Sequence, residues 1–131
     1  MKVIAIDISS TEALFCLKNE NMEAEYKKFT IGSDDTSVDL KKFYADVKHL
    51  FLEFAPNKVA ISKRGNKGKF AASSVSFKLE ALLQIASDIE IEIISPQTVA
   101  AYVKKNPMNL KPKYNYQLKC TELAFFIKSK P

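Results

Sequence analysis

The sequence is poor in the residues that mark disordered, disulfide-rich or membrane-spanning proteins. Its 131 residues include no Trp, three Gly, five Pro and two Cys. Nine Phe and five Tyr, with no low-complexity tract, supply enough large apolar side chains for a core and exclude an intrinsically disordered chain. No uninterrupted apolar run approaches the ~20 residues of a transmembrane helix, so we expect no membrane span.

The two cysteines, Cys16 and Cys120, lie far apart and have neither CxxC nor Cys/His spacing. This excludes a structural zinc site and predicts two buried thiols in a reducing compartment. The opening residues MKVIAIDIS carry Asp7 where a secretory signal would be apolar. We therefore expect a cytoplasmic protein that folds as one domain over residues 1–131.

Charge is unevenly distributed along the chain, although the net charge is only +5. Residues 1–57 contain seven Lys against ten acids, whereas residues 58–131 contain twelve Lys and one Arg against five acids. Such polarity predicts one face that meets a polyanion; the alternative is a solvated, Lys-rich surface. Because only one of the 20 basic residues is Arg, extensive reading of base edges is disfavoured.

Hydrophobic patterning predicts five strands and four helices. Residues 2–8 are apolar nearly throughout, which is typical of a strand buried on both faces, and strands at 13–18 and 24–31 complete an antiparallel meander. The expected elements that follow are a helix that begins at a Thr36–Asp39 capping box and ends before Pro56, a strand at 58–62, a helix with Val75, Leu79, Leu82 and Leu83 inward, a strand at 89–94, a helix opened by Ser95 and Pro96 that ends at Asn106-Pro107, and a last helix over 115–128.

Two of these elements carry further expectations. The 89–94 strand alternates isoleucine with Glu90 and Glu92, which predicts a solvated face and a place near a sheet edge. The last helix is apolar nearly all round, with one stripe and several other apolar side chains, so we expect it to pack on the core and also to meet something else, such as a second copy in a homodimer. The expected stripe is Tyr116, Cys120, Leu123 and Ile127, and the others are Leu118, Phe125 and Phe126.

The β-β-β-α-β-α-β-α-α order resembles the ribonuclease H-like superfold, a mixed five-stranded sheet flanked by helices. Three segments carry the resemblance, and they look closest to the RuvC-like resolvase branch: VIAIDIS at 3–9, VAISKRGNKGKFAASSVSFKLEALLQ at 59–84, and IISPQTVAAYVKK at 93–105. The RGNKGKF loop and the KKNP at 104–107 also resemble an uncharacterised bacterial family of small RuvC-like proteins.

The resemblance implies hydrolysis of phosphodiesters by two Mg²⁺ or Mn²⁺ ions held by three or four carboxylates. Asp7 stands where the family's central carboxylate would lie; the alternative is that it caps the turn at 9–11. The second carboxylate would stand at 62 or 63, where this sequence has Ser62 and Lys63. A Lys there places a positive charge where a cation should bind.

The third acid would come from the last helix, where Glu122 is the candidate for catalysis and metal binding together with Asp7. Its alternative role is an ion pair with Lys119 or Lys128. Two carboxylates do not complete the usual ligand set, which predicts a degenerate site with weak Mg²⁺ or Mn²⁺ binding, if any. A one-metal nuclease, with Lys63 offsetting phosphate charge, remains open.

The basic loop after the 58–62 strand is the candidate nucleic-acid contact. Its cations are Lys63, Arg64, Lys67 and Lys69, and Gly65 and Gly68 allow close approach of a partner. Such contacts to phosphates give salt-sensitive affinity with little sequence specificity. The alternative is a soluble loop whose charges bind nothing. A second basic group, Lys104, Lys105, Lys111 and Lys113, would widen the same surface.

Other chemistries find no support: the lone His49 sits on an amphipathic helix without a triad setting, and no P-loop or GxGxxG motif occurs. The sequence therefore favours a nucleic-acid-binding protein on a RuvC-like nuclease scaffold with little or no cleavage. Its alternatives are a metal-dependent DNA or RNA endonuclease and a protein-interaction module. DNA and RNA are not distinguished.

Overall fold

The computed structural model describes residues 1–20, 22–63, 74–109 and 111–130. Within these residues, five strands and four α-helices follow the order predicted from the sequence, with a short 3₁₀ turn before the last helix. The strands are β1 (Lys2–Ser9), β2 (Glu12–Asn19), β3 (Glu25–Thr30), β4 (Lys58–Ser62) and β5 (Ile91–Ile94). The helices are α1 (Ser37–Phe54), α2 (Ser74–Ala86), α3 (Pro96–Lys105), η1 (Asn115–Gln117, the 3₁₀ turn) and α4 (Leu118–Ser129).

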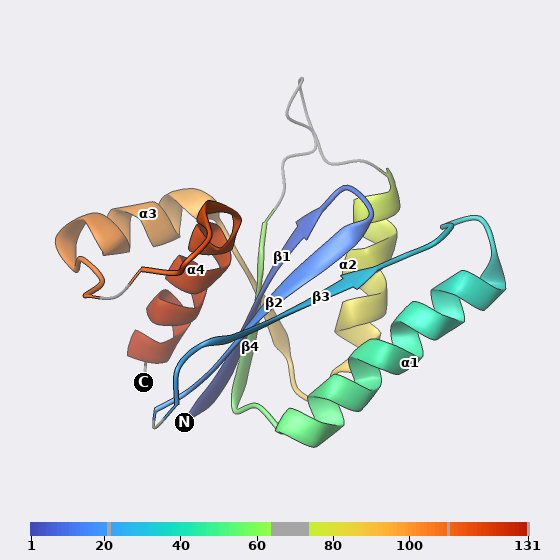
Figure 1. Cartoon of the computed structure of the whole chain (residues 1–131), viewed down its shortest axis with the longest axis horizontal. Coiled ribbons are helices and arrows are strands. Elements are labelled where there is room, and N and C mark those ends of the chain that lie inside the picture. Colours follow the sequence, from blue (N-terminus) through green and yellow to red (C-terminus); the bar gives the residue numbers. More distant parts are fainter. Residues whose placement is uncertain (21, 64–73, 110, 131) are drawn as a thin grey trace.

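The strands form one mixed sheet in the order β3-β2-β1-β4-β5. The predicted meander is confirmed, because β1 pairs antiparallel with β2 and β2 pairs antiparallel with β3. Strand β4 pairs in parallel with both β1 and β5, so the carboxyl ends of these three strands lie at one edge. Helices α1 and α2 cover one face of the sheet, and α3 and α4 cover the other (Figure 1). This arrangement confirms the ribonuclease H-like α/β fold.

Strand β1 is the centre of the sheet, and its sequence explains why. Val3, Ile4, Ala5 and Ile6 are all fully buried. Because side chains alternate along a strand, Ile4 and Ile6 enter the core beneath α1 and α2, whereas Val3 and Ala5 enter the core beneath α3 and α4. An unbroken apolar run is thus required, as in other strands covered on both faces.

The core beneath α1 and α2 is organised around Phe15 of β2. The fully buried Phe15 ring lies 5.1 Å from Phe29 of β3 and 6.0 Å from Phe51 of α1, measured between ring centroids. Helix α2 adds Leu79 and Leu83, both fully buried, as its inward face predicted. These contacts fix both helices against the sheet without using any polar side chain.

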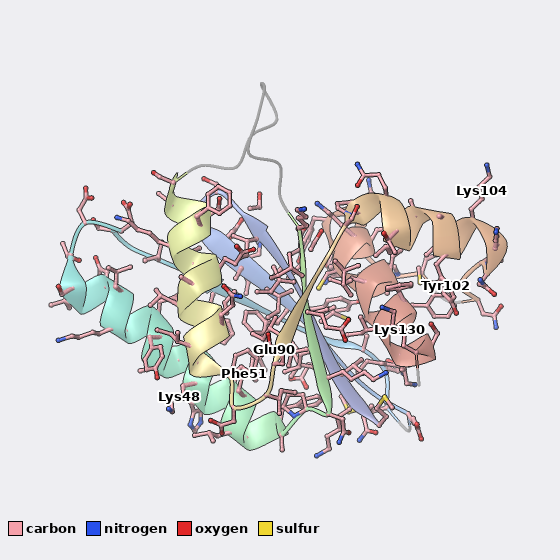
Figure 2. The ribbon with its side chains drawn as sticks, turned by 180° about the vertical axis from the view of Figure 1, so that it is seen from behind. Lys48, Phe51, Glu90, Tyr102, Lys104 and Lys130 are labelled. Carbon is pink, nitrogen blue, oxygen red and sulfur yellow. The ribbon has the colours of Figure 1, made fainter. Side chains whose placement is uncertain are left out.

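The second apolar face of α4 packs against α3 of the same chain. The Tyr102 ring of α3 lies 5.6 Å from Phe125 and 5.3 Å from Phe126 of α4 (Figure 2 labels Tyr102). Cys120, Leu123 and Ile127 face the sheet and are buried, as predicted. Part of the second apolar face of α4 is therefore covered by α3.

The prediction that Tyr116 belongs to the buried stripe of the last helix is wrong. Tyr116 is 56% exposed, and Gln117 beside it is buried. The α-helix begins only at Leu118, after a 3₁₀ turn over Asn115–Gln117. Because a 3₁₀ turn has three residues rather than 3.6, the helical stripe cannot be extended backward through it.

Helix caps and the sheet edge follow the sequence closely. The Thr36 hydroxyl accepts from the Asp39 backbone N–H at 3.3 Å, and the Ser95 hydroxyl accepts from that of Gln97 at 3.2 Å. Strand β5 lies at the sheet edge with Glu92 exposed, as expected, but it spans four residues instead of the predicted six. In the part of the chain that the structure describes, no helix is long and apolar enough to cross a membrane.

Replacing Phe15 with Ala is expected to lower the free energy of unfolding by about 3–5 kcal/mol, because it leaves a cavity under both helices. Urea denaturation measures the loss. The control is Leu52→Ala on the exposed side of α1, where Leu52 is 59% exposed and a change within about 0.5 kcal/mol is expected. Equal losses in the two variants would contradict this description of the core.

Candidate functional site

Asp7 lies on β1, two residues before the strand ends, at the edge formed by the carboxyl ends of the parallel strands. Ile6 of β1 is opposite Ile61 of β4, so Asp7 is in line with Ser62. Across β2, Asp7 is opposite Leu14. Both the central acid and the last residue of β4 therefore stand in one row across the sheet.

Alternation fixes which face of the sheet these side chains occupy. Ala5, Leu14 and Ala60 belong to the core beneath α3 and α4, so Asp7 and Ser62 are directed to that face as well. Ser62 is 4% exposed. The next residue, Lys63, still pairs in the sheet, because its backbone N–H donates to the Ile94 carbonyl at 2.8 Å. The position beside Asp7 is thus taken by a buried hydroxyl, whereas the exposed Lys63 alternates to the other face.

Cys120 of helix α4 contacts the backbone of β1 and β2 next to Asp7. The Cys120 thiol donates to the Ala5 carbonyl at 3.0 Å, with a second contact to the Leu14 carbonyl at 3.5 Å. Burial raises the pKa of the Cys120 thiol well above its ordinary value, so the group stays protonated and remains a donor. Cys16 and Cys120 are both buried and free, which confirms the prediction of buried thiols.

The neighbouring residue on α4, Lys119, places an ammonium group at the central carboxylate. Its Nζ lies 3.6 Å from Asp7 Oδ1. The Asp7 side chain is 18% exposed, whereas that of Lys119 is 51% exposed. A carboxylate this far removed from water requires charge compensation, and Lys119 supplies part of it. From the sequence, Lys119 is only one of two alternative partners for Glu122, because a pair within one helix is visible in sequence and a contact with the first strand is not.

Glu122 lies one turn farther along α4 and is half-buried. The helix runs antiparallel to β1 and β4, because Lys58, at the start of β4, donates from Nζ to the carbonyls of Ile127, at 3.2 Å, and Lys130. Each step along α4 from Lys119 therefore leads away from the edge where Asp7 stands. Within the described part of the chain, neither Lys119 nor Lys128 forms an ion pair with Glu122.

The carboxylates do not gather into a larger cluster. Over residues 1–20, 22–63, 74–109 and 111–130, no group of three or more His, Cys, Asp or Glu side chains could hold a metal ion. Of the predicted phosphate contacts, Lys63 is exposed at the end of β4, while Arg64, Lys67 and Lys69 lie outside the described residues. The edge that carries Asp7 is therefore flanked, among described residues, by Lys63 and Lys119.

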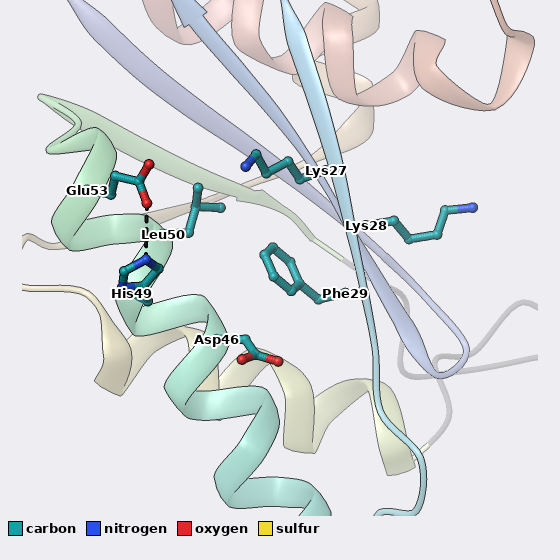
Figure 3. A pocket seen from close by; sticks show the side chains of 7 residues that line it. All are labelled: Lys27, Lys28, Phe29, Asp46, His49, Leu50 and Glu53. Carbon is teal, nitrogen blue, oxygen red and sulfur yellow. Dashed lines mark ion pairs between the residues drawn. The ribbon is translucent and has the colours of Figure 1, made fainter.

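A separate groove of about 470 Å³ runs between β3 and α1, and it includes the single histidine. His49 Nε2 lies 3.1 Å from Glu53, an exposed pair one helical turn apart (Figure 3). Lys27 and Phe29 of β3 point into this groove, whereas Lys28 points to the opposite side of the strand (Figure 3). The groove faces α1, so it is on the face of the sheet opposite Asp7. The residues that line this groove with His49 include no Ser, Thr or Cys.

The fold is similar to that of Holliday junction resolvases. A solved structure of Thermus thermophilus RuvC in complex with Holliday junction substrate matches with a TM-score of 0.74 and 13% identity, covering 98% of this chain and 95% of that one. A second Thermus thermophilus RuvC structure matches with a TM-score of 0.63 and 13% identity, covering 95% and 91%. The yeast mitochondrial Holliday junction resolvase matches with a TM-score of 0.54 and 13% identity, covering 96% of this chain and 62% of that one.

At these identities the likeness establishes a RuvC-like, ribonuclease H-like fold and nothing finer. No curated protein matches the sequence. A family model described as "Protein of unknown function (DUF3010)" matches residues 1–127, nearly the whole chain.

Proposed function

Because the chain belongs to the DUF3010 family, whose description assigns no function, we propose a function from the site itself. The protein binds nucleic acid on a RuvC-like nuclease scaffold whose metal site is altered, and it cleaves little or not at all. Asp7 and Glu122 are the remnants of the metal-binding carboxylates, and Lys63, Arg64, Lys67 and Lys69 contact phosphates.

The observation that carries this proposal is the 3.6 Å contact between Lys119 Nζ and Asp7. A divalent ion at Asp7 would stand beside the positive charge of Lys119, which opposes its binding. Ser62, rather than an acid, is in line with Asp7 on β4. This set of residues does not fit a centre of two divalent ions, which requires several carboxylates around each ion.

The same residues suit a polyanion. Ammonium groups at the edge of the sheet attract phosphates without any need for metal, and their affinity falls steeply with salt. The relative solved with a Holliday junction substrate makes branched DNA the first ligand to test. Lys104 and Lys105 lie in the last turn of α3, which covers the same face of the sheet as α4 (Figure 2 labels Lys104). They add positive charge to that side of the protein.

Two alternatives remain as outcomes of experiment. A metal-dependent nuclease would require Asp7 and Glu122 to hold Mg²⁺ or Mn²⁺ despite Lys119. A protein-interaction module would show no affinity for nucleic acid. A homodimer through the last helix stays a prediction. Less apolar surface of that helix is available for it, because Tyr102 of α3 packs against Phe125 and Phe126. The cytoplasmic location and the single domain over residues 1–131 stay predictions.

Replacing Lys63, Arg64 and Lys67 together with Ala is expected to weaken binding to a labelled four-way junction. The slope of log affinity against log salt falls by about one for each phosphate contact removed. Fluorescence anisotropy at several salt concentrations measures both. The control replaces Lys41, Lys42 and Lys48 with Ala, which removes the same charge from α1 and should leave affinity nearly unchanged. Wild-type affinity in the first variant would exclude this loop as the contact surface, and no binding at low salt would overturn the proposed function.

Replacing Lys119 with Ala is expected to strengthen Mn²⁺ binding by about fivefold or more, because unit charges 4 Å apart interact by about 1 kcal/mol even in water. Isothermal titration of the protein without nucleic acid measures this. The gain should disappear when Asp7→Asn is added, and Lys128→Ala on the same helix should show no gain. Tight Mn²⁺ binding by the wild type would contradict the altered metal site.

A further inference from the structure

Tyr114 and Tyr116 form a stacked aromatic pair on the surface, just before α4. Their ring centroids are 5.8 Å apart, and the ring planes differ by 15°. The two residues are 49% and 56% exposed. Aromatic rings contribute most to folding when they are buried, so a stacked pair left half in water gives little to the core and presents aromatic surface to a ligand.

A lysine ammonium group lies over each ring of this pair. Lys28 of β3 lies 4.7 Å from the centroid of Tyr116, and Lys113 lies 5.3 Å from the centroid of Tyr114. Lys28 also lies 3.7 Å from Glu12, at the start of β2. Aromatic faces flanked by cations provide stacking for a base and charge for its phosphates, which is the combination used by proteins that bind single-stranded nucleic acid.

The turn that presents the two rings is held by a chain of hydrogen bonds that are partly shielded from water. Gln117, which is 7% exposed, donates from its backbone N–H to the Tyr114 carbonyl at 3.1 Å. The Gln117 carbonyl accepts from the Thr121 hydroxyl at 2.7 Å, and that hydroxyl lies 2.5 Å from the Tyr26 hydroxyl on β3. The turn that carries Tyr114 and Tyr116 is therefore attached to both α4 and the sheet. Binding a ligand there would cost little conformational entropy, because the turn is already ordered.

The pair lies close to Asp7 on the same face of the sheet. Asp7 is opposite Leu14, and Leu14 is opposite Lys28, so the three residues form one row across β1, β2 and β3. Figure 3 shows Lys28 directed away from α1, toward the side of the sheet that α4 covers. Neighbouring strands are about 4.8 Å apart, which separates the backbones at Asp7 and Lys28 by about 10 Å. Tyr116, over which Lys28 lies, is one turn before Lys119, the partner of Asp7.

From this arrangement we propose that Tyr114 and Tyr116 are a stacking platform for an unpaired base, in a strand whose phosphates lie along Lys28 and Lys113. The proposal deepens the proposed function and rests on it, because it names the class of nucleic acid that the surface selects. Bases within a continuous duplex have both faces covered by their neighbours, so only a single-stranded or branched region offers a free face. The protein therefore prefers single-stranded or branched nucleic acid to continuous duplex.

The lysines on the rings do not block such a base. An ammonium group on an exposed ring is held weakly, and stacking of a base on the same ring is the stronger interaction. The long Lys side chain moves aside without leaving the site, and its charge is then available to the phosphate next to the stacked base. When a base replaces the ammonium group on the ring, the lysine charge stays beside the nucleic-acid backbone.

The test compares leucine substitutions, which keep apolar volume but remove the aromatic face. The double variant Tyr114→Leu, Tyr116→Leu is titrated against a labelled 20-nucleotide single strand, as DNA and as RNA, and against continuous duplex DNA. Single-strand affinity is expected to fall about tenfold or more, with duplex affinity unchanged. Tyr116→Phe, which keeps the ring, should bind as the wild type does. The matched control is Tyr44→Leu on α1, where Lys48 lies 5.6 Å from the ring on the opposite face of the sheet.

The outcomes separate this proposal from the function on which it rests. If the wild type binds single strand and the double Leu variant binds it equally well, the platform is wrong and the proposed function stands. The platform is also wrong if single-strand and duplex affinity fall by the same factor. If the wild type binds no nucleic acid at low salt, both proposals fail. A second readout uses a single strand carrying 2-aminopurine, whose fluorescence should be quenched by the wild type and not by the double Leu variant.

Discussion

The packing of α4 across the central strands decides which side chains meet Asp7. The Cys120 thiol reaches the Ala5 carbonyl of β1 at 3.0 Å and sets the position of the helix on the sheet. With Cys120 in place, Lys119 is carried to the edge where β1 and β4 end, and its Nζ comes 3.6 Å from Asp7. The ammonium group beside Asp7 therefore depends on how the last helix packs against the first strand.

Most of the fold is readable in the sequence because its signals are local. The continuous apolar run of β1 predicts a strand covered on both faces, and the alternation at Glu90 and Glu92 predicts an edge strand. Thr36 and Ser95 mark helix starts because their hydroxyls bond to backbone groups two or three residues ahead. One wrong prediction is the burial of Tyr116, which lies in a 3₁₀ turn where we expect an α-helix. The spacing of apolar residues does not distinguish a 3₁₀ turn from the first turn of an α-helix.

The site is less readable, because its contacts join residues distant in the chain. Asp7 was identified from its place in the first strand, but its pairing with Lys119 spans most of the sequence and leaves no local signal. The meeting of Lys28 with Tyr116 is of the same kind. In the sequence, Lys111 and Lys113 precede Tyr114 and Tyr116, but only the sheet register and the Lys28 contact reveal that this segment shares a face with Asp7. Arg64, Lys67 and Lys69 lie outside the described residues, so their role rests on the sequence alone.

The proposal that Lys119 at Asp7 favours binding of nucleic acid over metal-dependent cleavage is tested most directly by one pair of gels. Labelled four-way junction, duplex, single strand and RNA–DNA hybrid are each incubated with the full chain, in Mn²⁺ and in EDTA. A native gel reports binding, and a denaturing gel reports cleavage. The account predicts shifted bands in both conditions and intact strands throughout. Cleavage that requires Mn²⁺ and disappears in Asp7→Asn would contradict it.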